Sequence, residues 1–250
     1  ELTNYLPNKK YAIRWKLDST KYSFIDFKGY EAGKKPSEIS GKPRLFYDRN
    51  KPFVRKVKFF DTYSSDKEIV IPSYYVIPKS EGKIIENLKR NQIKMKPLAK
   101  DTLIFVESYK ITDFKTVKNP YEGHYLHYET AVSKKTETLR FKKGDYLVPT
   151  KQTGVKFLLE TLEPEAIDSY FNWNEFDGIL GQKEYFSDYV FEDTAAELLR
   201  NNKALKAAFE MKKAVEKDFA ENGAAQLEWV YKNSEYYEGT VNQYPIYRIL

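Results

Sequence analysis

Short runs of alternating apolar and polar residues fill much of the first sixty positions of the chain. Side chains along a β-strand point alternately to its two faces, so a period of two predicts strands. Strands are expected at residues 11–15, 22–27 and 53–59. The intervening residues 29–52 contain three glycines and three prolines, and are expected to form a loop or a pair of irregular connections. This pattern predicts a small antiparallel β unit whose edges are protected by lysines.

The next part of the chain mixes strands with one helix. A helix is expected over residues 80–91, which carry an apolar stripe at helical spacing and begin with Ser80, a residue that can cap the first turn. The stripe consists of Ile84, Ile85 and Leu88. Strands are expected at 69–72, 74–78, 102–111, 123–132, 138–141 and 146–149, with turns at 133–136 and 142–145.

The last hundred residues have mainly helical periodicity. One helix is expected over residues 153–162, ended by Pro164, and Thr194 with Glu197 forms a capping box that would begin the next. Two helices follow this capping box, predicted by apolar residues at spacings of four, three and four. Their stripes are Ala204, Ala208, Met211 and Val215 in the first helix, and Ala220, Ala224, Leu227 and Tyr231 in the second. A terminal strand is expected over residues 244–250.

These elements predict an α+β fold. An antiparallel β-rich N-terminal part contains one strand–helix–strand unit, and a helical C-terminal part follows. We divide the chain into a β-rich section at 1–68, a mixed section at 69–150 and a mainly helical section at 151–250, which can pack as one continuous unit.

Charge changes sign along the chain. Residues 1–150 carry 31 Lys and Arg against 18 Asp and Glu, whereas residues 151–250 carry 11 against 18. The two parts are expected either to attract each other or to leave the basic part facing an acidic partner. The lysines are spread through loops without a nucleic-acid-binding motif, so nucleic acid is not an expected partner.

The ends and the composition exclude other classes. No apolar run is long enough to span a membrane, and the absence of cysteine excludes disulfides and thiolate chemistry. The chain begins without an initiator methionine or a signal peptide, so we expect Glu1 to lie inside a longer gene product.

The only two histidines are His124 and His127, three residues apart in a predicted strand. They would point to opposite faces and could not share a metal ion, so no metal-binding residues are predicted. No nucleophile-elbow motif accompanies them.

Carboxylates crowd residues 160–177, next to Trp173. Two acids across a cleft would suit a glycosidase, whereas solvated acids around a core tryptophan are the structural alternative. We assign no catalytic residue. The candidate binding or junction surface consists of Trp173, Glu175, Asp177, Tyr146, His124 and Tyr125.

Ordered motifs in the chain resemble the region downstream of the peptidase domain in bacterial zinc carboxypeptidases of the carboxypeptidase A superfamily. The central motifs are Tyr146-Leu-Val-Pro149, Leu158-Leu-Glu-Thr-Leu-Glu-Pro164 and Asn172-Trp-Asn-Glu-Phe-Asp177. The flanking motifs are Gly41-Lys-Pro-Arg-Leu-Phe-Tyr-Asp48, Tyr75-Val-Ile-Pro78, the helical pair, residues 231–237 and Tyr244-Pro-Ile-Tyr-Arg248. Each motif is weak alone, and their common order carries the resemblance.

The resemblance implies a parent metallopeptidase that is periplasmic or extracellular and removes C-terminal residues from peptides. Its zinc would lie in an N-terminal peptidase domain, bound by a His-x-x-Glu pair and a distant histidine. His124 is followed three positions on by His127, and His127 by Thr130, so no such residue is carried over and no cofactor is expected in this chain.

The expected function is that of a non-catalytic accessory region that packs beside the peptidase domain or limits access to it. Its partner would be that domain, or peptide or glycan. The alternative is a module that binds glycan, cell wall or another polyanion through a basic, Tyr-rich face. A hydrolase that uses the clustered carboxylates is a more distant alternative.

Overall fold

The computed structural model describes residues 6–250 and has the α+β fold predicted from the sequence, with antiparallel sheets followed by helices. Two compact units are present. One is Lys10–Val70, and the other contains residues 6–9 and 71–250. No helix in the described part of the chain is both long and apolar enough to cross a membrane.

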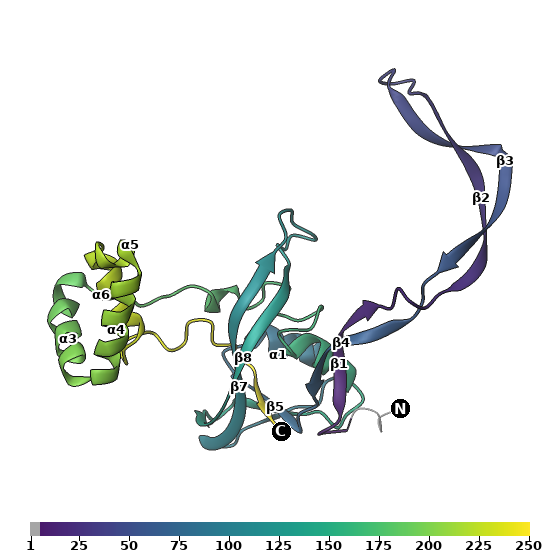
Figure 1. Ribbon diagram of the computed structural model, residues 1–250. Coiled ribbons are helices and arrows are strands. Elements are labelled where there is room, and N and C mark those ends of the chain that lie inside the picture. The colour runs from purple at the N-terminus through teal and green to yellow at the C-terminus, as the bar shows by residue number, and fades with distance from the viewer. Residues whose placement is uncertain (1–5) are drawn as a thin grey trace. The chain divides into compact units, whose positions relative to one another are not determined.

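The Lys10–Val70 unit consists of two antiparallel strand pairs (Figure 1). Strands β1 (Lys10–Leu17) and β4 (Tyr63–Val70) form one pair, and β2 (Ser23–Pro36) and β3 (Pro43–Phe59) form the other. The β2–β3 pair is a long ribbon whose register shifts between Tyr30 and Glu31.

The prediction of a loop over residues 29–52 was wrong, because β2 and β3 run through most of it. The two glycines within β2, Gly29 and Gly33, are tolerated because a phenylalanine of the opposite strand covers each of them. A Cβ atom added at Gly29 would lie 2.8 Å from the Phe53 ring, and one at Gly33 would lie 2.7 Å from the Phe46 ring. Aromatic cover of this kind compensates for the missing side chain of glycine in a strand.

A six-stranded antiparallel sheet forms the centre of the second unit, in the order β6-β9-β5-β10-β7-β8. Its strands are β5 (Tyr74–Ile77), β6 (Lys96–Pro97), β7 (Thr102–Thr116), β8 (His127–Phe141), β9 (Tyr146–Pro149) and β10 (Tyr247–Ile249). The C-terminal strand β10 therefore lies between β5 and β7.

The turn expected at residues 133–136 is absent from the described structure, and β8 is continuous there. Ser133 pairs with Lys110 and Thr136 pairs with Glu107 of the long strand β7. Polar residues suit this stretch because one face of an antiparallel sheet can be solvated. Thus two predicted strands form one.

Helices α1 (Gly82–Arg90) and α2 (Val155–Leu162) belong to the same unit. The predicted stripe of α1 is buried and the helix ends before Asn91, as expected. The predicted cap was wrong, since the helix begins after Glu81 and the Ser80 hydroxyl donates to the Glu81 carboxylate.

The remaining helices form a group around their own apolar cluster (Figure 1). They are α3 (Asp188–Asn201), α4 (Lys203–Val215), α5 (Lys217–Ala220) and α6 (Gly223–Lys232), and the short 3-10 helix η2 (Asp177–Ile179) precedes them. The cluster includes Phe191, Phe209, Phe219, Leu227 and Tyr231.

Two predictions for these helices were wrong. Thr194 lies inside α3, which begins seven residues earlier than the predicted cap would place it, after Ser187. In α4 the buried residue is Phe209, whereas Met211 and Val215 are exposed. An aromatic side chain buries more apolar area than the alanines of the predicted stripe, and this area selects the face that packs.

In α6, Leu227 and Tyr231 are buried as predicted, but Ala224 is exposed and Ala220 belongs to the separate helix α5.

Candidate functional site

Three of the six predicted surface residues meet where the loop after β7 packs against the segment that follows Pro164. The ring of Trp173 lies 5.6 Å from that of His124 and 6.3 Å from that of Tyr121, measured between centroids. Asn174 adopts a left-handed backbone conformation, with φ of 64°, and its amide donates to the carbonyl of Tyr125 over 2.8 Å. The loop is therefore held by an aromatic contact and a hydrogen bond.

The fourth predicted residue, Asp177, lies beside these contacts and binds His127. The distance between Asp177 Oδ1 and His127 Nε2 is 3.0 Å, and the Thr116 hydroxyl lies 2.9 Å from Nδ1. The imidazole is buried between the rings of Phe114 and Phe171. When Nε2 carries the proton and donates to the carboxylate, Nδ1 accepts from the threonine hydroxyl.

This threonine–histidine–aspartate set has the residue types of a nucleophile, a base and an orienting acid. A hydrolase also needs free N–H donors for the oxyanion. The N–H of Val117, next to Thr116, already donates to the carbonyl of Leu126 over 3.0 Å. The contacts of His127 therefore fit an anchor between β8 and the segment at Asp177 better than a catalytic centre.

Sequence reasoning missed this anchor because its members are far apart in the chain. The strand predicted over residues 123–132 begins only at His127, and His124 lies in the turn before it, so strand alternation does not describe this pair and gives no information on Thr116 or Asp177. The one feature of the sequence that could have indicated this anchor is His127 itself. A buried histidine requires polar partners.

The other two predicted residues, Glu175 and Tyr146, contact α1. The carboxylate of Glu175 forms an ion pair with Lys83 at 2.7 Å. Tyr146 lies on β9, and the ammonium of Lys89 is 5.9 Å from its ring centroid. Four of the six predicted residues thus lie around Trp173 and His127, whereas Glu175 and Tyr146 each contact a different lysine of α1.

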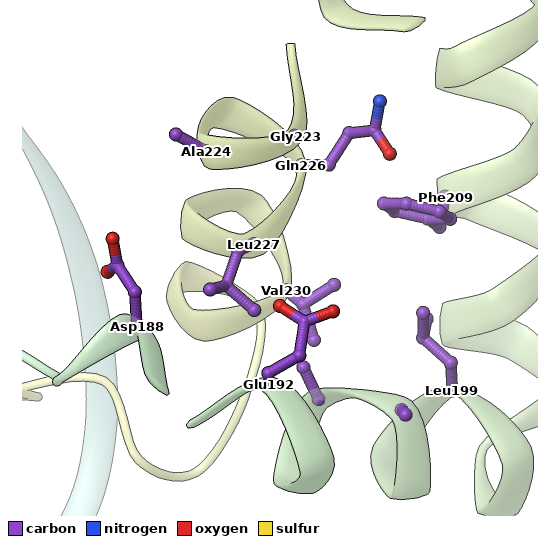
Figure 2. Close-up of a pocket in the computed structure, with 11 residues that line it drawn as sticks. Asp188, Glu192, Leu199, Phe209, Gly223, Ala224, Gln226, Leu227 and Val230 are labelled. Atoms are coloured by element: carbon purple, nitrogen blue, oxygen red, sulfur yellow. The ribbon is translucent and has the colours of Figure 1, made fainter. Parts of the chain in front are cut away.

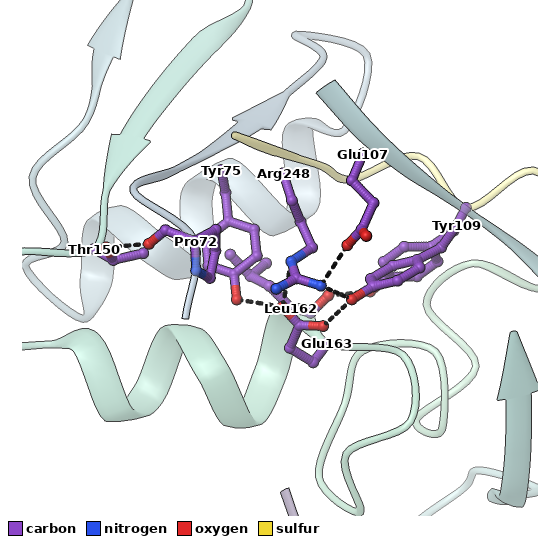
Figure 3. Close-up of polar contacts among 9 residues, drawn as sticks. Pro72, Tyr75, Glu107, Tyr109, Thr150, Leu162, Glu163 and Arg248 are labelled. Atoms are coloured by element: carbon purple, nitrogen blue, oxygen red, sulfur yellow. Dashed lines mark hydrogen bonds and ion pairs between the residues drawn. The ribbon is translucent and has the colours of Figure 1, made fainter. Parts of the chain in front are cut away.

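The crowded carboxylates of residues 160–177 have separate partners. Asp168 accepts from the Trp173 indole at 2.6 Å, Glu175 pairs with Lys83, and Asp177 binds His127. Glu163 is buried in a different network (Figure 3).

That network joins β5, β7, β10 and the end of α2 around Arg248, which is 1% exposed. The guanidinium lies 3.2 Å from Glu163 and 2.7 Å from Glu107 (Figure 3). The Glu163 carboxylate accepts from the hydroxyls of Tyr75, at 2.6 Å, and Tyr109, at 2.9 Å. Two buried opposite charges are thereby hydrogen-bonded on several sides, which offsets the cost of their desolvation.

Burial and the charge of Glu163 raise the pKa of Tyr75, Tyr109 and Tyr244 above the ordinary value. For Arg248, burial is the largest single cause and would lower the pKa, but Glu163, Tyr109, Tyr75 and Glu107 together outweigh it, and the pKa is raised. Arg248 therefore stays charged in the folded protein, and the three phenols stay neutral beyond the pH at which a free tyrosine ionises.

These raised phenol pKa values predict alkaline destabilisation. Unfolded tyrosines ionise near pH 10, whereas Tyr75, Tyr109 and Tyr244 stay protonated in the folded state. Their contribution to the free energy of unfolding is complete below about pH 10 and is lost as the pH rises above it. Urea titrations between pH 8 and 11.5 should show this fall, with a smaller slope in Tyr109→Phe and an unchanged slope in Tyr189→Phe, an exposed control. Equal slopes in all three proteins would contradict the prediction.

A groove of about 420 Å³ lies between α3 and α6 (Figure 2). Its lining includes Leu199, Leu227 and Phe209, together with the carboxylates of Asp188 and Glu192. Carboxylates beside an apolar surface suit contact with a basic, partly apolar segment.

The β2–β3 ribbon exposes a different kind of surface. Residues opposite each other in an antiparallel pair share a face. By this register, Ile25, Phe27, Phe53, Val57 and Phe59 lie on one side, which we call the apolar face. Arg55 lies on the same side, opposite Phe27, with its guanidinium 4.2 Å from the centre of the Phe53 ring. The opposite side, the basic face, carries Phe24, Lys28, Val54, Lys56 and Lys58.

The described residues, 6–250, contain no group of three or more histidine, aspartate or glutamate side chains placed to hold a metal ion. No family model matches the chain, and comparison with curated proteins and with solved structures also finds no match. Function must therefore be inferred from the contacts and surfaces of the chain itself, together with its ordered motifs.

Proposed function

We propose that this chain is a non-catalytic accessory region of a zinc metallocarboxypeptidase, located in the periplasm or at the cell surface. In this role it packs beside an N-terminal peptidase domain, which holds the zinc and the catalytic residues, or limits access to that domain.

The observation that supports the proposal is the convergence of the motifs on which the resemblance rests. Tyr75 begins one motif, Glu163 lies near the end of a second and Arg248 ends a third. Tyr75 donates to Glu163, and Glu163 pairs with Arg248. A buried ion pair requires each partner to be present, because either charge alone is strongly destabilising. Motifs joined in this way form one structural frame in this chain, and that frame is the part of the proposed accessory region on which the resemblance rests.

The basic face of the ribbon favours a second candidate function, which is binding to a glycan or another polyanion. Lys28, Lys56 and Lys58 lie on it together with two exposed apolar residues, Phe24 and Val54. Rows of lysines bind polyanions with strong salt dependence. A pull-down on cell-wall polymer at several salt concentrations would test this, and lack of binding at low salt would reject it.

The leading proposal is tested with the longer protein encoded by the same reading frame. That protein is expected to bind one zinc ion and to release C-terminal residues from peptides. Residues 1–250 alone should show no tight zinc site by calorimetry and no peptide hydrolysis, yet should bind the separately purified peptidase domain. A reading frame without a peptidase domain, or a tight zinc site that involves His124 or His127, would reject the proposal. Loss of that site in His127→Ala would identify the ligand.

A further inference from the structure

The β2–β3 ribbon is long but has no buried residue. Its strands contain 14 and 17 residues, and every one of them is exposed or half-buried. Phe27 is 50% exposed and Ile25 is 40% exposed. An isolated two-stranded ribbon is marginally stable in water and requires a further strand or an apolar surface against which to pack.

We propose that the apolar face of this ribbon is the docking surface for the peptidase domain, at an apolar patch surrounded by acidic side chains. The proposal rests on the proposed function and names the surface through which it operates. The five large side chains of the apolar face would bury roughly 400 Å² of area, if each buries about half of what a fully buried side chain does. This area is a reasonable apolar centre for an interface of about 800 Å² per partner.

The charge of the ribbon indicates whether its apolar face binds a second copy of the chain or an acidic partner. Residues 23–59 contain ten Lys and Arg against four Asp and Glu, a net charge of +6. Two ribbons packed face to face would bring these like charges together, which opposes association. A partner with an apolar patch and an acidic rim would instead be attracted to Arg55, which lies on the apolar face, and to the net positive charge of the ribbon.

The ends and edges of the ribbon favour docking by a face rather than by strand addition. Pro36 and Pro43 face each other next to the turn, and Pro52 lies at the register shift of β3. Proline has no N–H to donate to an added strand, and prolines and lysines at an edge prevent strand pairing with another chain. The side chains of the apolar face therefore provide the contact.

A matched pair of variants tests the proposal. Phe27→Ser/Val57→Ser removes two apolar residues from the apolar face, and Phe24→Ser/Val54→Ser removes two from the basic face. Binding of residues 1–250 to the purified peptidase domain, measured by calorimetry, should weaken at least tenfold in the first variant. The second should bind within twofold of the unchanged chain.

Two further measurements test the docking surface without the double variants, which could fail to fold. A photo-crosslinking amino acid at position 27 should react with the peptidase domain, and one at position 24 should not. Amide hydrogen exchange in residues 23–59 should be at least tenfold slower in the longer protein than in residues 1–250.

The outcomes separate the two ideas. If residues 1–250 do not bind the peptidase domain at all, the proposed function fails. If they bind it, but both double variants bind equally or crosslinks form only from position 24, the docking surface is wrong and the proposed function stands. Protection of the ribbon in residues 1–250 alone would also overturn the docking surface. Dependence of that protection on protein concentration would identify a second copy as the occupant.

Discussion

The Arg248→Met variant is expected to lose about 3–5 kcal/mol of its free energy of unfolding, as is usual when one partner of a buried ion pair is removed. Methionine fills much of the same volume, so the loss comes mainly from the Glu163 carboxylate. That group is 1% exposed and would keep its two tyrosine donors but lose its ion pair with Arg248. Urea denaturation followed by far-UV circular dichroism measures the effect.

A surface arginine in the same unit provides the control. Arg140 pairs with Asp101 at 3.5 Å, and its side chain is 67% exposed. Arg140→Met is expected to lose less than about 1 kcal/mol, because exposed ion pairs contribute little. Adding Glu163→Gln to Arg248→Met should recover part of the loss by removing the unpaired buried charge. Equal losses in the two arginine variants would contradict the assigned role of Arg248.

The periodicity of the sequence predicted the α+β class and most strands, because alternation and helical spacing reflect local geometry. Prediction from periodicity failed where a contact with a residue distant in the sequence overrides the local preference. Gly29 and Gly33 indicate a loop until the phenylalanines of the opposite strand cover them. Thr194 resembles a helix cap until the packing of Phe191 extends α3 towards its N-terminus.

The candidate site shows the same limit. The sequence identified Asp177, Trp173 and His124 as unusual residues, but not the contacts between them. Thr116 and Asp177 reach His127 from positions 11 and 50 residues away, a distance that no periodicity encodes. Glu163 was grouped with the other acids of its segment, although its partners lie on three different strands. The chemistry of each side chain can be predicted from the sequence, but which side chains meet in space depends on the topology of the fold.

The segment that follows Pro164 depends on one buried amide, that of Asn172. Its Nδ2 group donates to the carbonyls of Ala166, at 2.8 Å, and Ile167, at 3.2 Å, while its Oδ1 accepts from the hydroxyl of Thr130 at 2.9 Å. The side chain therefore closes a turn within the segment and fastens that turn to β8. Asparagine is required because both a donor and an acceptor are used.

Asn172→Asp is expected to lose about 3 kcal/mol or more at neutral pH, although the two side chains have nearly the same shape. The carboxylate cannot donate, so it would face two carbonyl oxygens in a site that is 5% exposed. Burial raises the pKa of the new carboxyl, so the folded state binds a proton more readily than the unfolded state. The difference from the unchanged protein should therefore shrink as the pH falls from 7 towards about 4.

Asn233→Asp is the matched control, since the Asn233 amide also donates to a carbonyl, that of Trp229 at 2.8 Å, but at an exposed helix end. Its loss should be about 1 kcal/mol, mainly from a negative charge at the C-terminus of a helix. Urea denaturation of both variants between pH 4 and 7 separates the two effects. A loss in Asn172→Asp that is no larger than this, or that does not change with pH, would mean that the amide does not hold the segment that supports Trp173 and Asp177.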